Sequence, residues 1–171
     1  KQAETTLKRQ LEEMAVLHEI STLGIQSASL DELLKQATYI VGEKLYSDNL
    51  DLLLVDEQKG VLRAHTTYRG LDLAEQNITI PLGKGVTGKT ALDGVSRRIA
   101  NIEKEPDYLM FGPAMRSELA VPIKTSDRVL GVINAESKEP GAFSEDDERL
   151  LDTLADQLAI AMTRLQLEGE L

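Results

Sequence analysis

The residues whose spacing most directly suggests chemistry lie between Gly83 and Thr90. They read Gly-Lys-Gly-Val-Thr-Gly-Lys-Thr and match the pattern G-x-x-x-x-G-K-[ST] at every defined position. In a phosphate-binding loop with this pattern, backbone amides surround the phosphates, the lysine reaches the β- and γ-oxygens, and the last hydroxyl binds Mg²⁺. Taken alone, the motif predicts an enzyme that binds a nucleotide.

The residues around this motif favour a different interpretation. A phosphate-binding loop follows a buried parallel strand, whereas the apolar run before this one, 78–80, is short and ends at Pro81. The best candidate for a second metal ligand, Asp56 at the end of an apolar run, precedes the loop instead of following it. We therefore interpret the glycines as a turn and keep a nucleotide-binding enzyme that uses Gly83–Thr90 as an alternative.

Cysteine and histidine, which often carry metal or nucleophilic chemistry, are scarce in this chain. The chain has no cysteine, which excludes disulfides, zinc–thiolate sites, thiol nucleophiles and a covalently attached bilin. The two histidines, His18 and His65, have no companion at the spacing of metal ligands. The sequence therefore predicts no metal site and no catalytic residues.

The charge and length of the chain limit its partners. It has 171 residues and a formal net charge of −10, so phosphate backbones and anionic lipid surfaces are repelled on average. No apolar run approaches the roughly 20 residues needed to span a bilayer, and no signal peptide is visible. We expect neither a nucleic-acid nor a membrane partner. Because the chain starts at lysine, we expect a piece of a longer cytoplasmic protein.

The hydrophobic periodicity predicts an α+β chain. Apolar residues at three- and four-residue steps predict a first helix over 1–24, and Ser29 with Glu32 has the spacing of a capping box that begins a second. Ser144, followed by four acidic residues, predicts the start of the last helix. The elements expected between these helices are strands at 50–55, 61–69, 78–80, 118–124 and 129–136, a short helix at 87–93 and an irregular segment at 96–116.

The C-terminal part of the chain resembles a GAF domain, a small-molecule-sensing module of signalling proteins. The resemblance rests on Ser-Glu-Leu-Ala-Val-Pro-Ile at 117–123, Gly-Val-Ile-Asn-Ala-Glu-Ser at 131–137, and Phe-Ser-Glu-Asp-Asp-Glu at 143–148 before an amphipathic helix. The glycine-rich turn at 81–88 also resembles one in this family. The resemblance implies a central antiparallel β-sheet with N- and C-terminal helices on one face. It also implies a ligand pocket under irregular segments on the other face.

The same resemblance implies a function. We expect a non-enzymatic sensory or regulatory domain of a signal-transduction protein, such as a sensor kinase of a two-component system, a cyclase or a transcription activator. A small molecule of unknown identity would bind non-covalently between the sheet and the segment 96–116. GAF proteins that reduce methionine sulfoxide need cysteines, which this chain lacks. The expected ligand-binding residues, taken from the family's layout, are Tyr68, Asn101, Phe111, Arg116 and Ser117.

Haem and cyclic nucleotides are two other ligands known for GAF domains. A haem held by one histidine would use His65, although a surface or core histidine is the favoured interpretation. Domains that bind cyclic nucleotides carry Asn-Lys and then Phe-x-x-x-Asp-Glu. This chain has Asn134, but Ala135 follows it in place of the lysine, and the acids at 147–148 are explained as helix caps.

The terminal helices predict a homodimer. Apolar residues recur at three- and four-residue steps in both helices, as in a coiled-coil seam. We expect a dimer through Leu7, Leu11, Met14, Leu151, Leu154, Leu158 and Leu165. On this view, residues 1–28 form a signalling and dimerisation helix, 29–171 form the GAF domain, and helix packing relays ligand binding to flanking output domains. A ligand-free dimerisation module is the second alternative.

Overall fold

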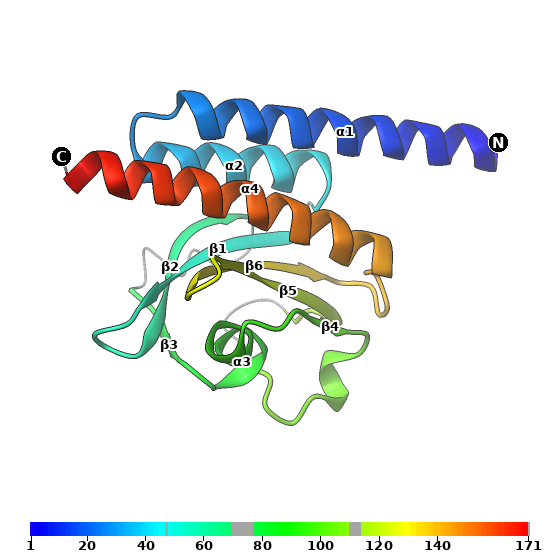
Figure 1. Ribbon diagram of the computed structural model, residues 1–171. Helices are drawn as coiled ribbons and strands as arrows, with labels where there is room; N and C mark the ends of the chain where they lie inside the picture. Colours follow the sequence, from blue (N-terminus) through cyan, green and yellow to red (C-terminus); the bar gives the residue numbers. More distant parts are fainter. Residues whose placement is uncertain (47, 70–76, 110–113, 171) are drawn as a thin grey trace.

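The computed structural model describes residues 1–46, 48–69, 77–109 and 114–170, and it has three layers (Figure 1). Three helices cover one face of a curved antiparallel sheet, and a short helix with its connecting segments lies on the other face. The sheet order is β3-β2-β1-β6-β5-β4. The strands are β1 (Asn49–Asp56), β2 (Val61–Tyr68), β3 (Thr79–Pro81), β4 (Arg97–Ile99), β5 (Ser117–Lys124) and β6 (Val129–Ser137). The predicted α+β fold is confirmed.

The helices are α1 (Gln2–Gln26), α2 (Leu30–Lys44), α3 (Gly85–Asp93), a 3₁₀ turn η1 (Ile102–Lys104) and α4 (Glu145–Glu170). Of these, α2 and α4 begin at the predicted caps Ser29 and Ser144, whereas α1 and α3 begin without a side-chain cap. The Glu32 amide donates to Ser29 Oγ at 3.2 Å, and the Ala28 amide donates to Glu32 Oε2 at 3.3 Å. At the start of α4, the Ser144 amide donates to Asp147 Oδ2 and the Asp147 amide donates to Ser144 Oγ. The start of α4 is therefore a reciprocal capping box, whereas at the start of α2 Glu32 accepts from the amide of Ala28, one residue before the cap Ser29.

The sheet separates two apolar cores because side chains alternate across it. From β1, Leu50 and Leu52 point to the helix side, where the larger core lies against α1, α2 and α4. Leu53 of the same strand points to the other side and packs with Val132 and Val86 under α3. This two-sided burial explains why the run 50–55 is apolar at nearly every position.

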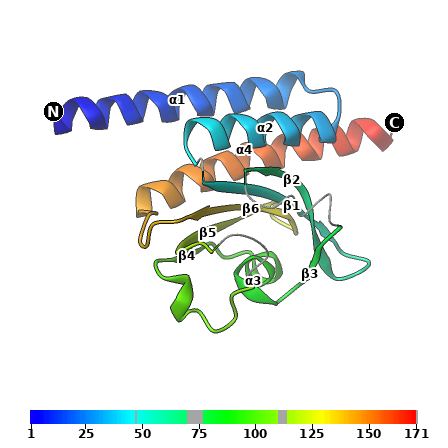
Figure 2. The ribbon, with the colours of Figure 1, turned by 180° about the vertical axis from the view of Figure 1, so that it is seen from behind.

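Helices α1 and α4 run side by side in the same direction, and α2 returns beside them (Figure 1, Figure 2). The two chain ends therefore lie at opposite ends of the helical layer, and the first turns of α1 project beyond the sheet. Val16 and Ile20 of α1 lie in the helix-side core. The predicted domain boundary between residues 28 and 29 stays a prediction. Every helix in the described part of the chain is too polar or too short to span a bilayer.

The structure corrects the expected role of α4 in a dimer seam. Leu151, Leu154 and Leu158 have exposed fractions of only 0, 1 and 3 %, because α4 packs on the sheet and on α1. They belong to the chain's own core and are not available to a partner. Leu165, nearer the end of α4, is half-buried. The residues expected from α1 differ, since Leu7, Leu11 and Met14 are 56, 57 and 65 % exposed.

Candidate functional site

The glycine-rich segment 83–90 forms the turn from β3 into α3, and its polar groups are used within the fold. The Gly83 amide donates to the Gly88 carbonyl at 2.8 Å, and the Lys84 amide donates to the Pro81 carbonyl at 3.1 Å. Lys89 pairs with Asp107, and Thr90 is fully buried. A side chain at Gly88 would lie 2.6 Å from the Pro81 carbonyl oxygen, so close backbone packing requires this glycine. The glycines are therefore explained without a phosphate.

The polar residues that remain unexplained lie on the α3 side of the three central strands. They are Asn49 and Asp51 of β1, Glu118 of β5, and Asn134 and Glu136 of β6. Each alternates with residues of the helix-side core and shares its face with the core under α3. Strand pairing places Glu136 directly opposite Asn49 on one side and Glu118 on the other. We call these five residues the acidic cluster.

Hydrogen bonds within the acidic cluster satisfy only part of it. The Asn49 side-chain amide donates to Asp51 Oδ2 at 3.0 Å and to Glu136 Oε1 at 3.1 Å. The hydroxyl of Tyr108, from the segment 96–116, donates to Glu136 Oε2 at 2.8 Å. Among the described residues, no partner is present for Glu118 Oε2, Asn49 Oδ1 or Asn134 Oδ1, although all three atoms are buried. Each of these atoms is a hydrogen-bond acceptor.

The electrostatics of the acidic cluster favour a positively charged ligand. Burial is the main cause that raises the pKa of Glu118 well above its usual value, and the negative charges of Glu136 and Asp51 raise it further. Burial likewise raises the pKa of Glu136, although the Tyr108 hydroxyl and Asn49 oppose this change by stabilising its carboxylate. Burial, and then the charge of Glu136, raises the pKa of the Tyr108 hydroxyl. A cation placed here would offset the repulsion between the carboxylates and would favour their charged forms.

No metal cluster accounts for these carboxylates. Within the residues that the structure describes, no group of three or more His, Asp or Glu side chains is arranged to hold a metal ion. The unpartnered acceptors are available to a ligand that donates hydrogen bonds. An ammonium group meets this requirement because it carries three donors and a positive charge.

The four predicted ligand-binding residues that the structure describes do not form one site. Asn101 accepts a hydrogen bond from the Glu103 amide as the cap of η1, and Arg116 forms an ion pair of 3.6 Å with Glu103. The Ser117 hydroxyl donates to the Glu139 carbonyl at 2.6 Å, so it holds the turn after β6. Tyr68 packs on the helix face, edge-on to Tyr39. Phe111 lies outside the described residues.

Ser117, taken from the family's layout, and its neighbour Glu118, which was not predicted, lie on opposite sides of the sheet. Successive side chains of β5 face opposite sides of the sheet, so an error of one residue exchanges the two faces. The sequence did contain a signal for the acidic cluster. Asp51, Glu118 and Asn134 interrupt apolar strand segments, and a polar residue there must be hydrogen-bonded or serve a ligand.

The structure also separates the residues expected to recognise a cyclic nucleotide. Asn134 lies on the α3 side of the sheet, whereas Asp147 lies at the start of α4 on the helix side. Asp147 accepts hydrogen bonds from the Tyr46 hydroxyl at 2.8 Å and from Arg9 at 3.2 Å. It therefore joins α4 to α1 and acts as a cap. His65 lies beside α2, with Nε2 3.4 Å from Asp31 Oδ1, and burial is the main cause that lowers its pKa.

Comparisons with known proteins show which sequences and structures this chain is similar to. A family model described as a GAF domain matches residues 27–163. The chain is 30 % identical over 87 residues to protein YtsP of Bacillus subtilis, which covers 51 % of this chain and 53 % of that protein. It is 28 % identical over 81 residues to free methionine-R-sulfoxide reductase of Escherichia coli, covering 47 % and 49 %. These matches span about half the length of each relative.

Two solved structures share the fold at an identity of 22 %. One is the GAF domain from a phosphoenolpyruvate-protein phosphotransferase of Coxiella burnetii, with a TM-score of 0.84 over 94 % of this chain and 98 % of that one. The other is free methionine-R-sulfoxide reductase from Neisseria meningitidis in complex with its substrate, with a TM-score of 0.83 over 94 % and 93 %. At this identity the likeness concerns the fold alone.

These comparisons correct the prediction that the chain is not an enzyme. That prediction is wrong because a relative and several structural neighbours with this fold are free methionine-R-sulfoxide reductases, which are enzymes. Because enzymes also have this fold, the fold is no argument against catalysis. The sequence restricts only the kind of chemistry, since a chain without cysteine has no thiol of its own to supply.

Proposed function

The chain belongs to the GAF domain family, and we propose that it is a regulatory domain that binds a small ammonium-bearing molecule non-covalently at the acidic cluster. One observation carries this proposal. Glu118, Asn49 and Asn134 are buried on one face of the sheet, and each keeps an acceptor oxygen without a partner among the described residues. A buried polar atom without a partner costs about 1–3 kcal/mol, and a donor from a ligand removes this cost.

The segment 96–116 supports the proposed binding mode because two contacts hold part of it against the site. The Tyr108 hydroxyl donates to Glu136 within the acidic cluster. Its neighbour Asp107 pairs with Lys89 of α3. A ligand that binds Glu118 and Glu136 therefore lies next to Tyr108, and its binding changes the contacts of this segment. On this proposal the ligand lies between the sheet and the segment, as the family resemblance implies.

Thermal unfolding with a panel of amines tests the proposal. The panel holds free amino acids and spermidine, with choline, whose nitrogen has no N–H donor, and Mg-ATP, Mg-GTP and cyclic nucleotides as comparison compounds. A ligand at 100 times its dissociation constant stabilises the fold by about 2.7 kcal/mol. For a domain of this size that corresponds to a rise of roughly 5–10 °C in the unfolding midpoint.

Matched variants connect the response to the acidic cluster. We expect Glu118→Gln to abolish the shift, since it keeps the shape of the side chain and removes the charge. Glu139→Gln is the control, because Glu139 is exposed. A flat response to every amine contradicts the proposal and favours a ligand-free dimerisation module. A response to Mg-ATP or Mg-GTP alone favours the alternative that uses Gly83–Thr90.

We also propose that the domain forms a homodimer through α1. Leu7, Leu11 and Met14 follow steps of four and three residues on one exposed face, and Ile25 continues the same heptad spacing at 76 % exposure. A second copy of α1 would bury this face. Because α1 and α4 run in the same direction and leave at opposite ends, a change in their packing would be relayed to flanking domains.

The contacts between α1 and α4 support this relay at both ends of the pair. Arg9 of α1 contacts Asp147 at the start of α4 at 3.2 Å. At the other end, the Arg164 guanidinium donates to the Gly24 carbonyl at 3.0 Å and to the Ser27 carbonyl at 2.9 Å. The two helices are therefore joined near both ends and would move together.

A further inference from the structure

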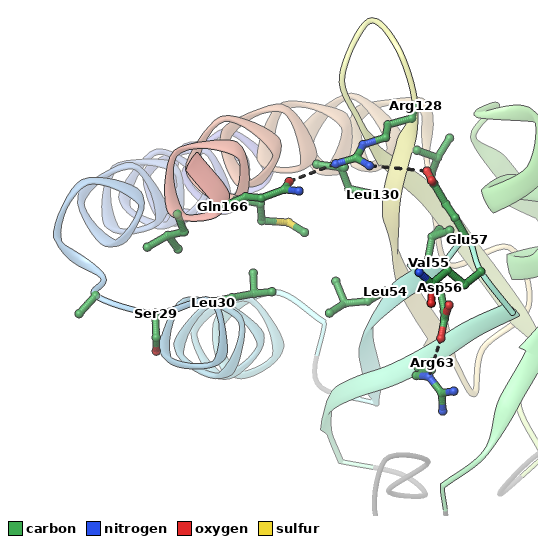
Figure 3. A pocket seen from close by; sticks show the side chains of 15 residues that line it. Ser29, Leu30, Leu54, Val55, Asp56, Glu57, Arg63, Arg128, Leu130 and Gln166 are labelled. Carbon is green, nitrogen blue, oxygen red and sulfur yellow. Dashed lines mark hydrogen bonds and ion pairs between the residues drawn. The ribbon is translucent and has the colours of Figure 1, made fainter. Parts of the chain in front are cut away.

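A hollow lies on the helix side of the sheet, at the opposite end of the strands from the acidic cluster (Figure 3). It is a groove of about 630 Å³ between the start of α2, the β1–β2 turn, the β5–β6 turn and the last turns of α4. This volume lies within the usual range for small-molecule sites. The acidic cluster lies on the other face of the sheet, so the two sites are separate.

The floor of the groove is apolar because the helix-side core opens to the surface here. Leu30, Leu54, Leu130 and Leu165 are half-buried and pack against that core, and Met162 lines the groove beside them. They come from α2, β1, β6 and α4, and Figure 3 shows Leu30 and Leu54 directed into the same space. An apolar hollow formed by four separate elements can take up an aliphatic chain.

One side of the groove carries a guanidinium with donors to spare. Arg128 Nη2 donates to Gln166 Oε1 at 3.1 Å, and Nη1 lies 3.8 Å from Glu57 Oε1, beyond hydrogen-bond distance (Figure 3). A guanidinium has five N–H donors, so most of those on Arg128 are not used by these two contacts. Glu57 is well exposed and can turn into water at little cost.

The other carboxylate at the rim is already engaged. Asp56 Oδ1 accepts a hydrogen bond from the Lys59 amide at 3.1 Å, and Oδ2 accepts one from Arg63 Nε at 3.3 Å. These contacts hold the pKa of Asp56 below its usual value, with the Lys59 amide as the largest cause. Asp56 is thus bound within its own turn and directed toward Arg63 (Figure 3). Arg128 is left as the charge on the rim that a ligand can use.

We propose that this groove binds a small organic anion with an aliphatic tail, such as a medium-chain carboxylate. The tail lies on Leu30, Leu54 and Leu130, and the carboxylate replaces Glu57 as the partner of Arg128. Arg128 donates to Gln166, so the bound anion also changes the contacts of the last turns of α4. The site is independent of the proposed function at the acidic cluster.

The methionine methyl groups test this proposal directly. Met162 lines the groove, whereas Met14 is exposed on α1 and Met115 belongs to the segment near the other face of the sheet. The protein is labelled with ¹³C at the methionine methyls and titrated with octanoate below its micelle concentration. We expect a saturable shift of the Met162 signal and unchanged signals from Met14 and Met115. No saturable shift of Met162, or parallel shifts of the Met14, Met115 and Met162 signals, overturns the proposal.

Variants and a chain-length series identify the two parts of the site. Arg128→Gln should weaken octanoate binding about tenfold, because a charge-assisted hydrogen bond is lost. Arg149→Gln is the control, since Arg149 is exposed and pairs only with acids of the first turn of α4 among the described residues. Hexanoate should bind roughly tenfold more weakly than octanoate, since two methylene groups leave the groove. Equal binding of octylammonium, or equal binding by Arg128→Gln, overturns the assignment of the charged end.

Discussion

The two faces of the same sheet differ in what they bury. On the helix side, Leu50, Leu119 and Ile133 lie in a continuous apolar core with α4. On the α3 side, the neighbouring positions of the same strands are Asp51, Glu118 and Asn134. Burying apolar side chains stabilises a fold, whereas burying carboxylates opposes it unless they are paired. The helix face therefore serves stability, and the α3 face gives up stability at the cluster where we propose that a ligand binds.

The strongest test of this contrast is a truncation in the helix-side core. Leu154→Ala removes a buried side chain of α4 and should lower the free energy of unfolding by about 2–5 kcal/mol. Urea denaturation followed by circular dichroism measures this loss. Leu167→Ala, at an exposed position of the same helix, should change the stability by less than about 0.5 kcal/mol. Similar losses for both variants would show that α4 does not hold this core.

A substitution on the α3 face should raise the stability of the fold instead of lowering it. Burial raises the folded-state pKa values of Glu118 and Glu136 above 4.5, the ordinary value for a glutamate. The stability that their protonated forms contribute is therefore fully present below about pH 4.5 and is lost as the pH rises through the raised values.

Glu118→Gln should raise the unfolding midpoint at neutral pH without ligand and flatten its pH dependence above pH 4.5, compared with the unsubstituted protein. Midpoints measured from pH 4.5 to 8 test this expectation. Acidic groups with lowered pKa, such as Asp93 at about 2, lose their contribution only at lower pH and do not interfere. An unchanged profile would show that Glu118 is not held in a carboxylate cluster.

The outer surface of α1 offers a test with little effect on the fold. Leu11→Glu places a charge in the exposed seam, so it should weaken the dimer by at least about tenfold and leave the monomer folded. Sedimentation equilibrium measures the association. Leu167→Glu, exposed near the end of α4, is the control. A monomer in the unsubstituted protein at high concentration would refute the proposed dimer.

The smallest effect is expected at Lys89, which the phosphate-loop pattern would make essential. Its contact with Asp107 is an ion pair near the surface, and such pairs contribute about 0–1 kcal/mol. Lys89→Ala should therefore leave thermal unfolding nearly unchanged, with or without Mg-ATP. Loss of a nucleotide-dependent shift in this variant would support the alternative that uses Gly83–Thr90.

Local sequence signals predicted most of the helices and strands. They failed for elements whose structure depends on contacts with residues far along the chain. Ser29 and Ser144 cap helices through groups three residues away, so the sequence nearby contains the whole interaction. Strand β4 was missed because its residues 97–99 gain strand structure only by pairing with β5, about twenty residues later. Residues 102–104 were likewise expected to be irregular, although they form the 3₁₀ turn η1.

The sequence by itself determined the fold class and the starts of α2 and α4, because periodicity and capping residues act over a few residues, and its resemblance to GAF domains indicated the family. Only the tertiary structure decided which face of each helix and strand is buried and which is exposed. Leucines at three- and four-residue steps suit a dimer seam or a core equally, and packing on the sheet buried Leu154 and Leu158 while Leu7 and Leu11 stayed exposed. On β5, the register turned Glu118 to the α3 side and Ser117 away from it, since neighbouring residues of a strand face opposite sides.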